Sequence, residues 1–374
     1  MLVLSGLSLA VWLYLIFARG GFWLAAEREA DAPAPAVWPE VVAVIPARDE
    51  ADTIAATLGS LLRQDYPGLL RIVLVDDESS DGTSEAARRA AGGRLEIIAG
   101  TPTPAGWSGK LWAVAQGVAA AGETPRYLLL TDADIAYAPG ALAGLVAGSE
   151  AQGLGLNSLM ARLACASFPE RVAIPAFILF FQMLYPFAWV NAPGAKTAAA
   201  AGGCMLVRRE ALAAAGGVAA IRGALIDDCA LARLLKAHGP IRLRLAERVA
   251  SLRRYRDFIE IRRMVVRSAY AQLNYSPALL VFTLAAMVLV FIVPVAAALF
   301  AQGGSQAAGL GAWALMATAF QPTLRCYRVS PLWGFALPAI AALYAFYTLE
   351  SGLASARGEG GLWKGRYQER TARR

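Results

Sequence analysis

Acidic side chains stand at the ends of three apolar segments in this 374-residue chain. The first segment ends in Arg48-Asp49-Glu50, the second in Asp76-Asp77-Glu78, and the third in Asp132-Ala133-Asp134. Crowded carboxylates are unfavourable unless a cation or a donor-rich ligand satisfies them. A turn followed by a helix cap would explain one such stretch, because Asp81 and Thr83 suit a cap. Three stretches together favour a ligand site.

Asp132 and Asp134 project from the same side of an extended segment. Mg²⁺ and Mn²⁺ prefer such oxygen ligands, and they bind water and phosphate oxygens at the same time. A lone Asp-x-Asp is common on surface loops, but this pair directly follows the apolar run Tyr127–Leu130. We therefore expect Asp132 and Asp134 to hold Mg²⁺ or Mn²⁺.

A glycine turn, a helix start and a lysine coincide at Gly106-Trp107-Ser108-Gly109-Lys110. Helix N-termini attract anions, so Lys110 is expected to bind a group such as a pyrophosphate. An exposed lysine in an ordinary loop would give the same pattern. The chain has neither GxxxxGK[ST] nor GxGxxG after a strand, which disfavours ATPase and dinucleotide-binding functions.

The segment from Val41 to about Leu252 alternates short β-branched runs with alanine-rich amphipathic stretches. This alternation predicts βαβ units and a mostly parallel sheet, an α/β fold. Ligands bind at the carboxyl ends of parallel strands, so the acidic groups should meet at one edge. The predicted strand and helix pairs are Val41–Ile45 with Thr53–Gln64, Arg71–Val75 with Thr83–Ala91, Leu95–Ala99 with Leu111–Ala121, and Tyr127–Thr131 with Pro139–Ala147.

The composition indicates segments that lie in lipid, because 57% of the residues are hydrophobic and only 17% are charged. Met1–Ala18 and Ser268–Leu324 contain no charged residue. Leu279–Phe300, with a kink at Pro294, and Val329–Leu349 are long enough to span a bilayer. The four cysteines form no CxxC pair, which is typical of a reducing compartment and disfavours zinc or disulfides.

The net charge of +7 comes from basic clusters that flank apolar segments, which favours an anionic lipid surface over nucleic acid. The predicted organisation is an anchor at 1–18, a linker at 19–40, an α/β domain at 41–252 with an interfacial segment at 172–195, a basic interfacial helix at 253–276, membrane helices at 277–350 and a basic tail at 351–374.

Several of these motifs together resemble the large family 2 glycosyltransferases, and the resemblance runs from Val41 to about Ser276. It rests on the stretch Ile45–Glu50, on Asp76-Asp77-x-Ser79-x-Asp81-Gly82-Thr83, on Gly109-Lys110, on Asp132-Ala133-Asp134 and on Ile226-Asp227-Asp228. The resemblance implies a glycosyltransferase A-type fold. It also implies an inverting hexosyltransferase that uses a UDP- or GDP-type nucleotide sugar.

The resemblance further assigns roles to individual residues. Asp228 would act as the general base on the acceptor hydroxyl, and Asp132 and Asp134 would hold the metal and the diphosphate. Asp227 alone could simply complement a helix dipole, because it begins a helical run. The residues that would bind the donor are Pro46, Ala47, Arg48, Glu50, Asp77, Ser79, Lys110, Asp132, Gly203 and Arg267.

One departure from the family pattern bears on the product. Met264-Val265-Val266-Arg267-Ser268 stands where processive polysaccharide synthases carry QxxRW, so only Arg267 matches. This departure favours transfer of a single sugar. Arg267 could still contact the diphosphate, and a role facing anionic lipid fits equally well.

The whole layout, including Pro104–Ala113, Arg267–Leu273 and Gly361–Arg366, is similar to the hopene-associated glycosyltransferases. Those are bacterial membrane enzymes that are similar in turn to ceramide and carotenoid-acid glycosyltransferases. The resemblance implies a membrane lipid acceptor, a hopanoid or related isoprenoid. It also implies a multi-pass protein of the bacterial inner membrane with its catalytic domain in the cytoplasm.

Two alternatives from other classes predict different sequences. A sugar-1-phosphate nucleotidyltransferase would have a glycine- and arginine-rich loop after the first strand, whereas a helix directly follows Pro46–Glu50. An inactive lipid-binding scaffold would lack a base or a metal ligand. Asp77, Asp132, Asp134 and Asp228 are all present, which disfavours the scaffold.

Overall fold

The computed structural model describes residues 1–358, 362–363 and 366–367. These residues form two compact units. The sheet unit contains Glu27–Ala164 and Trp189–Arg253, and the helical unit contains Met1–Ala26, Cys165–Ala188 and the described residues from Arg254 to 358. Half of the predicted basic tail at 351–374 lies outside the described residues. Its described part consists of residues 351–358, most of which belong to a helix, and a pair of two-residue strands, β9 (Leu362–Trp363) and β10 (Arg366–Tyr367).

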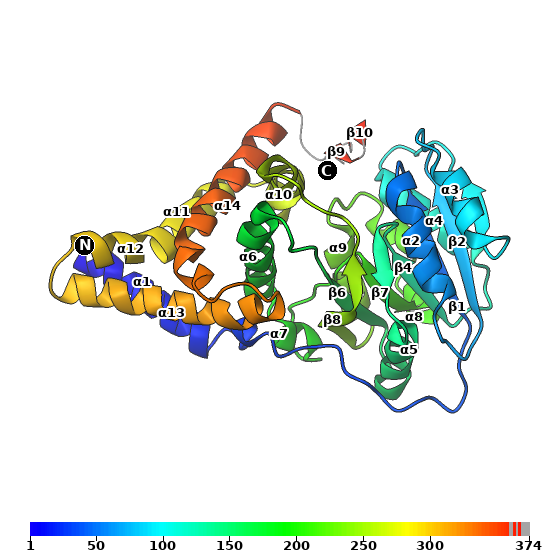
Figure 1. The fold of residues 1–374 in the computed structure, drawn as a ribbon, viewed down its shortest axis with the longest axis horizontal. Helices are drawn as coiled ribbons and strands as arrows, with labels where there is room; N and C mark the ends of the chain where they lie inside the picture. Colours follow the sequence, from blue (N-terminus) through cyan, green and yellow to red (C-terminus); the bar gives the residue numbers. More distant parts are fainter. Residues whose placement is uncertain (359–361, 364–365, 368–374) are drawn as a thin grey trace. The chain divides into compact units, whose positions relative to one another are not determined.

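The sheet unit is built on one mixed sheet, drawn in Figure 1. Strands β3, β2, β1 and β4 are parallel neighbours, and so are β6 and β8. Strand β7 runs antiparallel between β4 and β6, and β5 runs antiparallel to β8. The prediction of a mostly parallel α/β sheet is therefore confirmed. In spatial order the strands are β3 (Glu96–Ala99), β2 (Leu70–Asp76), β1 (Val41–Ala47), β4 (Tyr127–Thr131), β7 (Cys204–Arg208), β6 (Leu156–Arg162), β8 (Ile241–Ser251) and β5 (Ile135–Tyr137).

Helices cover both faces of the central strand β1, and every residue of that strand is buried. Ile45 packs in one core cluster with Ile54 and Leu58 of the following helix. On the other face, a Cβ at Gly117 would lie 2.4 Å from Val44 Cγ1, so only glycine allows this approach. The helices of this unit are α2 (Ala51–Leu62), α3 (Thr83–Ala91), α4 (Gly109–Ala120), α5 (Ala141–Gln152), α8 (Arg209–Ala214), the 3₁₀ turn η2 (Val218–Ile221) and α9 (Asp227–Lys236).

Part of the segment predicted as a linker is hydrogen-bonded along strand β8. The backbone N–H of Glu29 donates to Leu245 O at 2.9 Å, and Leu245 N donates to Glu27 O at 2.8 Å. The Arg248 guanidinium reaches carboxylate oxygens of Glu29 and Asp31 at 2.7 Å each. These contacts fix the start of the sheet unit to one of its strands.

The helical unit consists of the first residues of the chain, one internal segment and the stretch that follows Arg253. Two of its described helices, Pro277–Phe300 and Trp333–Ala356, are long and apolar enough to cross a membrane, and α1 is a shorter apolar helix. Its elements are α1 (Leu2–Phe17), η1 (Phe22–Leu24), α6 (Phe168–Leu184), α10 (Phe258–Gln272), α11 (Pro277–Met287), the π-helical turn η3 (Val288–Ile292), α12 (Val293–Phe300), α13 (Gly304–Cys326) and α14 (Trp333–Ala356), while α7 (Phe187–Asn191) contains the boundary between the units.

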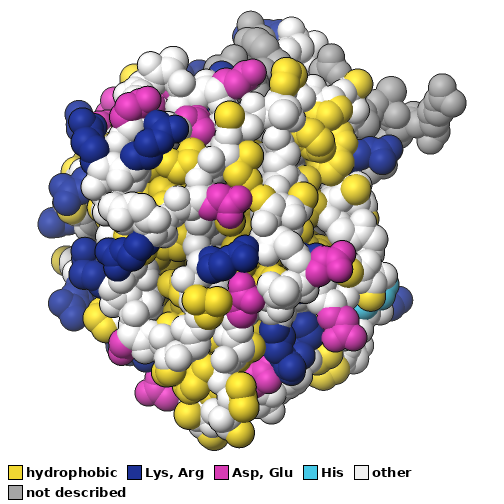
Figure 2. Space-filling view, turned by 90° about the vertical axis from the view of Figure 1, so that its right-hand side faces the viewer, with side chains coloured by type: hydrophobic (Ala, Val, Ile, Leu, Met, Phe, Trp, Pro, Cys, Tyr) yellow, Lys and Arg dark blue, Asp and Glu magenta, His cyan; other side chains and the backbone are white. Residues whose placement is uncertain are grey.

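The two long helices differ in how much of their apolar surface is covered. Only 11% of the most apolar window of Pro277–Phe300 is buried, compared with 44% for Trp333–Ala356. Val281, Phe282 and Phe300 are among the exposed large side chains of the first helix. Figure 2 shows a face of the molecule that, unlike these apolar helices, carries acidic and basic side chains among apolar ones, a mixture typical of a surface in water.

The predicted kink at Pro294 is accompanied by a π-helical turn over Val288–Ile292, just before the proline. Proline has no N–H, so the carbonyl four residues earlier, at Val290, lacks its usual helical donor. The indole Nε1 of Trp12 donates to Val290 O at 2.8 Å. Trp12 is fully buried, and its ring packs edge-on against Phe291 at 5.7 Å. The N-terminal helix thus supplies the hydrogen bond that the proline cannot.

This hydrogen bond predicts a coupling between Trp12 and Pro294. Trp12→Phe should destabilise the protein by about 1–3 kcal/mol, because the partly buried Val290 carbonyl loses its donor. In a Pro294→Ala background the penalty should be smaller, since the new alanine N–H can bond that carbonyl. The free energies of unfolding of the wild type, the two single variants and the double variant, measured in detergent, give the coupling. The smaller volume of the phenylalanine ring affects both backgrounds equally, so its effect cancels in the comparison. An equal penalty in both backgrounds would contradict this account.

Candidate functional site

The loops that follow β1 and β2 are joined by reciprocal hydrogen bonds. Ser79 Oγ accepts from the backbone N–H of Asp49 at 3.1 Å, and Thr83 Oγ1 accepts from Glu50 N at 2.8 Å. Asp81 accepts from Ala51 N at 2.9 Å and from Thr83 N at 3.0 Å, whereas the N-cap residue of α3 is Gly82, without a side-chain cap hydrogen bond. The two acidic strand ends are therefore held as one surface.

Asp77 is the most deeply placed acid of this surface, with only 1% of the residue exposed. Its backbone N–H donates to Ala47 O at 2.8 Å, which continues the pairing of β1 with β2. Arg48 Nη1 lies 3.8 Å from Asp77 Oδ2, and the same guanidinium donates to the Asp77 carbonyl. The predicted donor-binding residues Pro46, Ala47, Arg48, Asp77 and Ser79 thus lie together at the carboxyl ends of β1 and β2.

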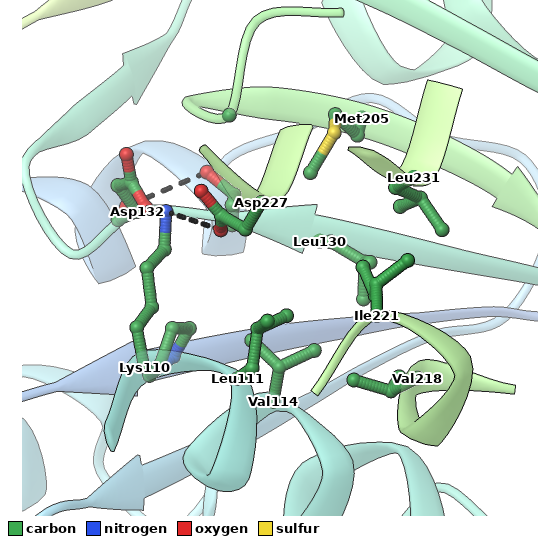
Figure 3. Close-up of a pocket in the computed structure, with 13 residues that line it drawn as sticks. Lys110, Leu111, Val114, Leu130, Asp132, Met205, Val218, Ile221, Asp227 and Leu231 are labelled. Carbon is green, nitrogen blue, oxygen red and sulfur yellow. Dashed lines mark hydrogen bonds and ion pairs between the residues drawn. The ribbon is translucent and has the colours of Figure 1, made fainter. Parts of the chain in front are cut away.

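A second group of charges centres on Lys110, the second residue of α4. Its ammonium lies 2.9 Å from Asp132 Oδ1 and 3.1 Å from Asp227 Oδ2, as Figure 3 shows. Asp132 follows β4 and Asp227 begins α9, so the lysine joins two segments that are far apart in the sequence. The N-cap Ser108 accepts from Leu111 N at 3.3 Å and fixes the start of the lysine's helix.

The charges of this group depend on one another. Burial alone would lower the pKa of the Lys110 ammonium. The nearby Asp132 and Asp227 carboxylates outweigh this effect, so the pKa of the lysine is raised. Burial, and then the neighbouring Asp227, raise the pKa of Asp228 above its usual range, while Lys110 opposes that rise. A carboxylate whose pKa is raised toward neutrality is suited to accept a proton.

Asp228 is positioned by two backbone donors. Its Oδ2 accepts from Gly202 N at 2.9 Å, and its Oδ1 accepts from Cys229 N at 2.7 Å. A Cβ at Gly202 would lie 3.4 Å from Lys110 Nζ and 3.5 Å from Asp228 Oδ2, so Gly202 stands beside both charges. The glycine segment before β7 therefore meets the acidic start of α9.

The candidate metal ligand Asp134 lies in a crowded acidic environment. Burial, followed by the carboxylates of Asp132 and Glu50, raises the pKa of Asp134 to about 6, against the opposing charges of Arg253 and Lys110. A divalent cation would relieve this crowding, and the all-oxygen donor set suits Mg²⁺ or Mn²⁺.

Asp132 and Asp134 could supply only part of a metal coordination sphere. No group of three or more His, Cys, Asp or Glu side chains within residues 1–358 is arranged to hold a metal ion. Mg²⁺ commonly takes one or two carboxylates and completes its shell with water and substrate phosphate oxygens. The two aspartates fit that kind of site.

Two predicted donor-binding residues have other surroundings. A Cβ at Gly203 would lie 2.9 Å from Ile135 Cδ1, so packing against β5 explains this glycine, and its carbonyl accepts from Thr131 Oγ1 at 2.8 Å. Arg267 lies on α10 in the helical unit, apart in the chain from the residues of the sheet unit. A contact between Arg267 and the donor stays a prediction.

Sequence reasoning missed two features of the site. From the sequence, Asp227 needs no role beyond complementing the helix dipole, yet its carboxylate forms an ion pair with Lys110. Its position next to Asp228 is the one feature of the sequence that points to a role in the site. Arg253 was counted among lipid-facing basic residues, yet its charge acts on Asp134. The backbone explains its position, because Leu252 N donates to Asp134 O at 2.7 Å.

Comparison with protein families gives a match over part of the chain. Residues 42–216 match the family model described as Glycosyl transferase family 2. A mannosyltransferase from Pyrobaculum calidifontis, solved in complex with GDP-Man and Mn²⁺, is similar at 20% identity, covering 95% of this chain and 99% of that chain, with a TM-score of 0.55. A search of curated proteins gave no significant match.

Weaker structural similarity extends to two other enzymes. Mannosyl-3-phosphoglycerate synthase from Rubrobacter xylanophilus is 20% identical, covering 71% of this chain and 83% of that chain, with a TM-score of 0.40. Glucosyl-3-phosphoglycerate synthase from Mycobacterium tuberculosis is 19% identical, covering 60% and 75%, with a TM-score of 0.37. The match over residues 42–216 and the fold shared with the Pyrobaculum protein support a glycosyltransferase whose sheet unit has an A-type fold.

Proposed function

We propose that the protein transfers a single sugar from a nucleotide diphosphate sugar to a membrane lipid, with inversion and with the help of a divalent metal. The observation that carries this proposal is the meeting of Asp132, Lys110, Asp227 and Asp228 at one edge of the sheet. Inverting transfer needs a base for the acceptor and positive charge for the leaving diphosphate. This edge offers both within one cluster.

Asp228 is the proposed general base. Its carboxylate is held by the N–H groups of Gly202 and Cys229, so it has a fixed direction. Its raised pKa makes it a better proton acceptor than an ordinary surface aspartate. We assign it the proton of the acceptor hydroxyl as that oxygen attacks the sugar carbon.

The leaving diphosphate is assigned to the side of the cluster formed by Lys110, Asp132 and Asp134. Lys110 would contribute a fixed positive charge at the start of α4, where helix N–H groups also favour anions. A divalent cation bound by Asp132 and Asp134 would neutralise charge that develops on the diphosphate. Arg48, Asp77 and Ser79 are assigned to the nucleoside of a UDP- or GDP-type donor.

The proposal of a lipid acceptor that receives one sugar is based on the helical unit and on the absence of the complete processive motif. The helix Pro277–Phe300 leaves most of its apolar surface uncovered, as a membrane-embedded helix would. Only Arg267 remains of QxxRW, which favours one transfer event over polymer growth. The resemblance to hopene-associated enzymes makes a hopanoid or related isoprenoid the proposed acceptor, at the cytoplasmic face of a bacterial inner membrane.

Sugar transfer to lipid tests this function directly. The purified protein in detergent, given labelled UDP- or GDP-hexoses and a bacterial lipid extract, should yield a lipid that carries one hexose. Asp228→Asn should keep donor binding but lose transfer by about 100-fold or more, because the base is gone. Mass spectrometry of the lipids and calorimetry of donor binding measure the two effects.

Asp52→Asn is the matched control, because Asp52 also stands in the first turn of a helix but is exposed and outside the cluster. It should transfer sugar as the wild type does. Unchanged turnover in Asp228→Asn would remove Asp228 from the role of base. Addition of many hexoses to one acceptor would contradict single transfer.

Metal dependence tests the role of Asp134. Asp134→Ala should weaken nucleotide diphosphate binding by about tenfold when Mg²⁺ or Mn²⁺ is present, which corresponds to about 1.4 kcal/mol. With a chelator, mutant and wild type should bind the nucleotide equally, since the carboxylate acts only through the metal. Calorimetry under both conditions measures this difference, and an equal loss with and without chelator would refute metal ligation by Asp134.

A further inference from the structure

The glycine that holds the proposed base is reached through a buried stretch of alanines. Residues 198–201, here called the alanine stretch, are all buried, and they lie between α7 and β7 without belonging to a helix or strand. Buried backbone N–H and C=O groups need partners, and this stretch has no secondary structure of its own to supply them. Side chains of neighbouring elements therefore help to fix its position.

One of these side chains is Ser158 of β6. Its hydroxyl accepts from Ala201 N at 2.9 Å, and it lies 3.2 Å from Ala201 O and 3.0 Å from Cys204 O. These contacts fix the end of the alanine stretch against the sheet. Further contacts come from α9.

The ammonium of Lys236, the last residue of α9, binds three backbone carbonyls close to the alanine stretch. It donates to Trp189 O at 3.0 Å, to Val190 O at 2.7 Å and to Thr197 O at 2.6 Å. The first two carbonyls belong to the last turn of α7, where carbonyls lack helical donors and a lysine can bind them. Thr197 directly precedes the alanines, so Lys236 joins the chain on both sides of the intervening loop.

The surroundings of Lys236 indicate that it serves as a donor to the backbone. A lysine ammonium has three N–H donors, and the three carbonyls can use all of them. Burial lowers the pKa of Lys236. Within the part of the chain that the structure describes, no ion pair between this lysine and a carboxylate offsets that effect. The carbonyls are therefore the groups that stabilise its charge.

The two ends of α9 hold the same piece of chain. Lys236 binds Thr197 O at one end, and Asp228 accepts from Gly202 N at 2.9 Å at the other. The helix rises about 12 Å between these two residues, at 1.5 Å per residue. The extended chain from Thr197 to Gly202 can span about 17 Å. The alanine stretch is thus long enough to run beside α9 from one bond to the other.

We propose that Lys236 is a positioning residue, which clamps the alanine stretch onto α9 so that the Gly202 N–H meets the carboxylate of Asp228. The inference rests on the function proposed above, in which Asp228 is the base. It gives a role in sugar transfer to a residue at the opposite end of the base's own helix. Lys236 acts through the backbone that leads to Gly202.

Lys236→Met tests the clamp, because it removes the ammonium but keeps most of the hydrocarbon side chain. Three carbonyls lose their donor, and the backbone that directs Asp228 loosens. Transfer to lipid at saturating donor should fall about tenfold, while the affinity for UDP or GDP stays at the wild-type value. A labelled nucleotide sugar with a bacterial lipid extract measures transfer, and calorimetry measures nucleotide binding.

The same substitution in the Asp228→Asn background separates positioning from a general structural effect. With no base left to direct, Lys236→Met should lower the residual transfer by less than about twofold. Lys196→Met is the matched control, because Lys196 is an exposed lysine in the same loop. It should transfer sugar as the wild type does.

Hydrogen exchange followed by mass spectrometry detects the clamp without any lipid. In Lys236→Met, peptides that cover residues 198–203 should exchange about tenfold faster, while peptides of β1 keep the wild-type rate. Lys236→Gln provides a second variant in case the methionine variant does not fold. Glutamine keeps two N–H donors, so exchange and transfer should lie between those of the wild type and those expected for methionine.

Wild-type exchange in the alanine stretch of the folded variants would overturn the clamp. Wild-type transfer, or an equal loss of transfer in both Asp228 backgrounds, would overturn its role in positioning the base. Failure of the proposed function looks different, because the wild type would then transfer sugar to no lipid although its alanine stretch stays protected.

Discussion

The ammonium of Lys110, held between Asp132 and Asp227, is the interaction on which the proposed site depends. Three carboxylates, those of Asp132, Asp227 and Asp228, approach one another from the end of β4 and the start of α9. Such a group is unfavourable without a central positive charge. The lysine supplies that charge, and it simultaneously links the side assigned to the donor with the side assigned to the acceptor.

The sheet topology explains how these residues come together. Parallel pairing of β1, β2 and β4 puts their carboxyl ends at one edge, which collects the acidic loops. Strand β7 then enters antiparallel beside β4, so its amino-terminal end, and the Gly202 that precedes it, lie at the same edge. The backbone of Gly202 can therefore hold Asp228 next to the lysine.

The parallel half of this arrangement was predictable from the sequence, and the rest was not. Strands such as Val41–Ala47 and Tyr127–Thr131 are continuous apolar runs with acids at their ends, a pattern that is local and strong. The pairing of Lys110 with Asp227 depends on how distant segments fold together, which no local pattern contains. The hydrogen bond from the Trp12 indole to the Val290 carbonyl, four residues before Pro294, could not be predicted for the same reason.

A double-mutant cycle on Lys110 and Asp227 tests the central claim most directly. Lys110→Met and Asp227→Asn should each reduce sugar transfer, and the double variant should be little worse than the worse single variant, because both remove one interaction. Transfer rates of the four proteins, measured at saturating donor, give the coupling. Reductions that multiply in the double variant would show that the two residues act independently, and would contradict an ion pair at the heart of the site.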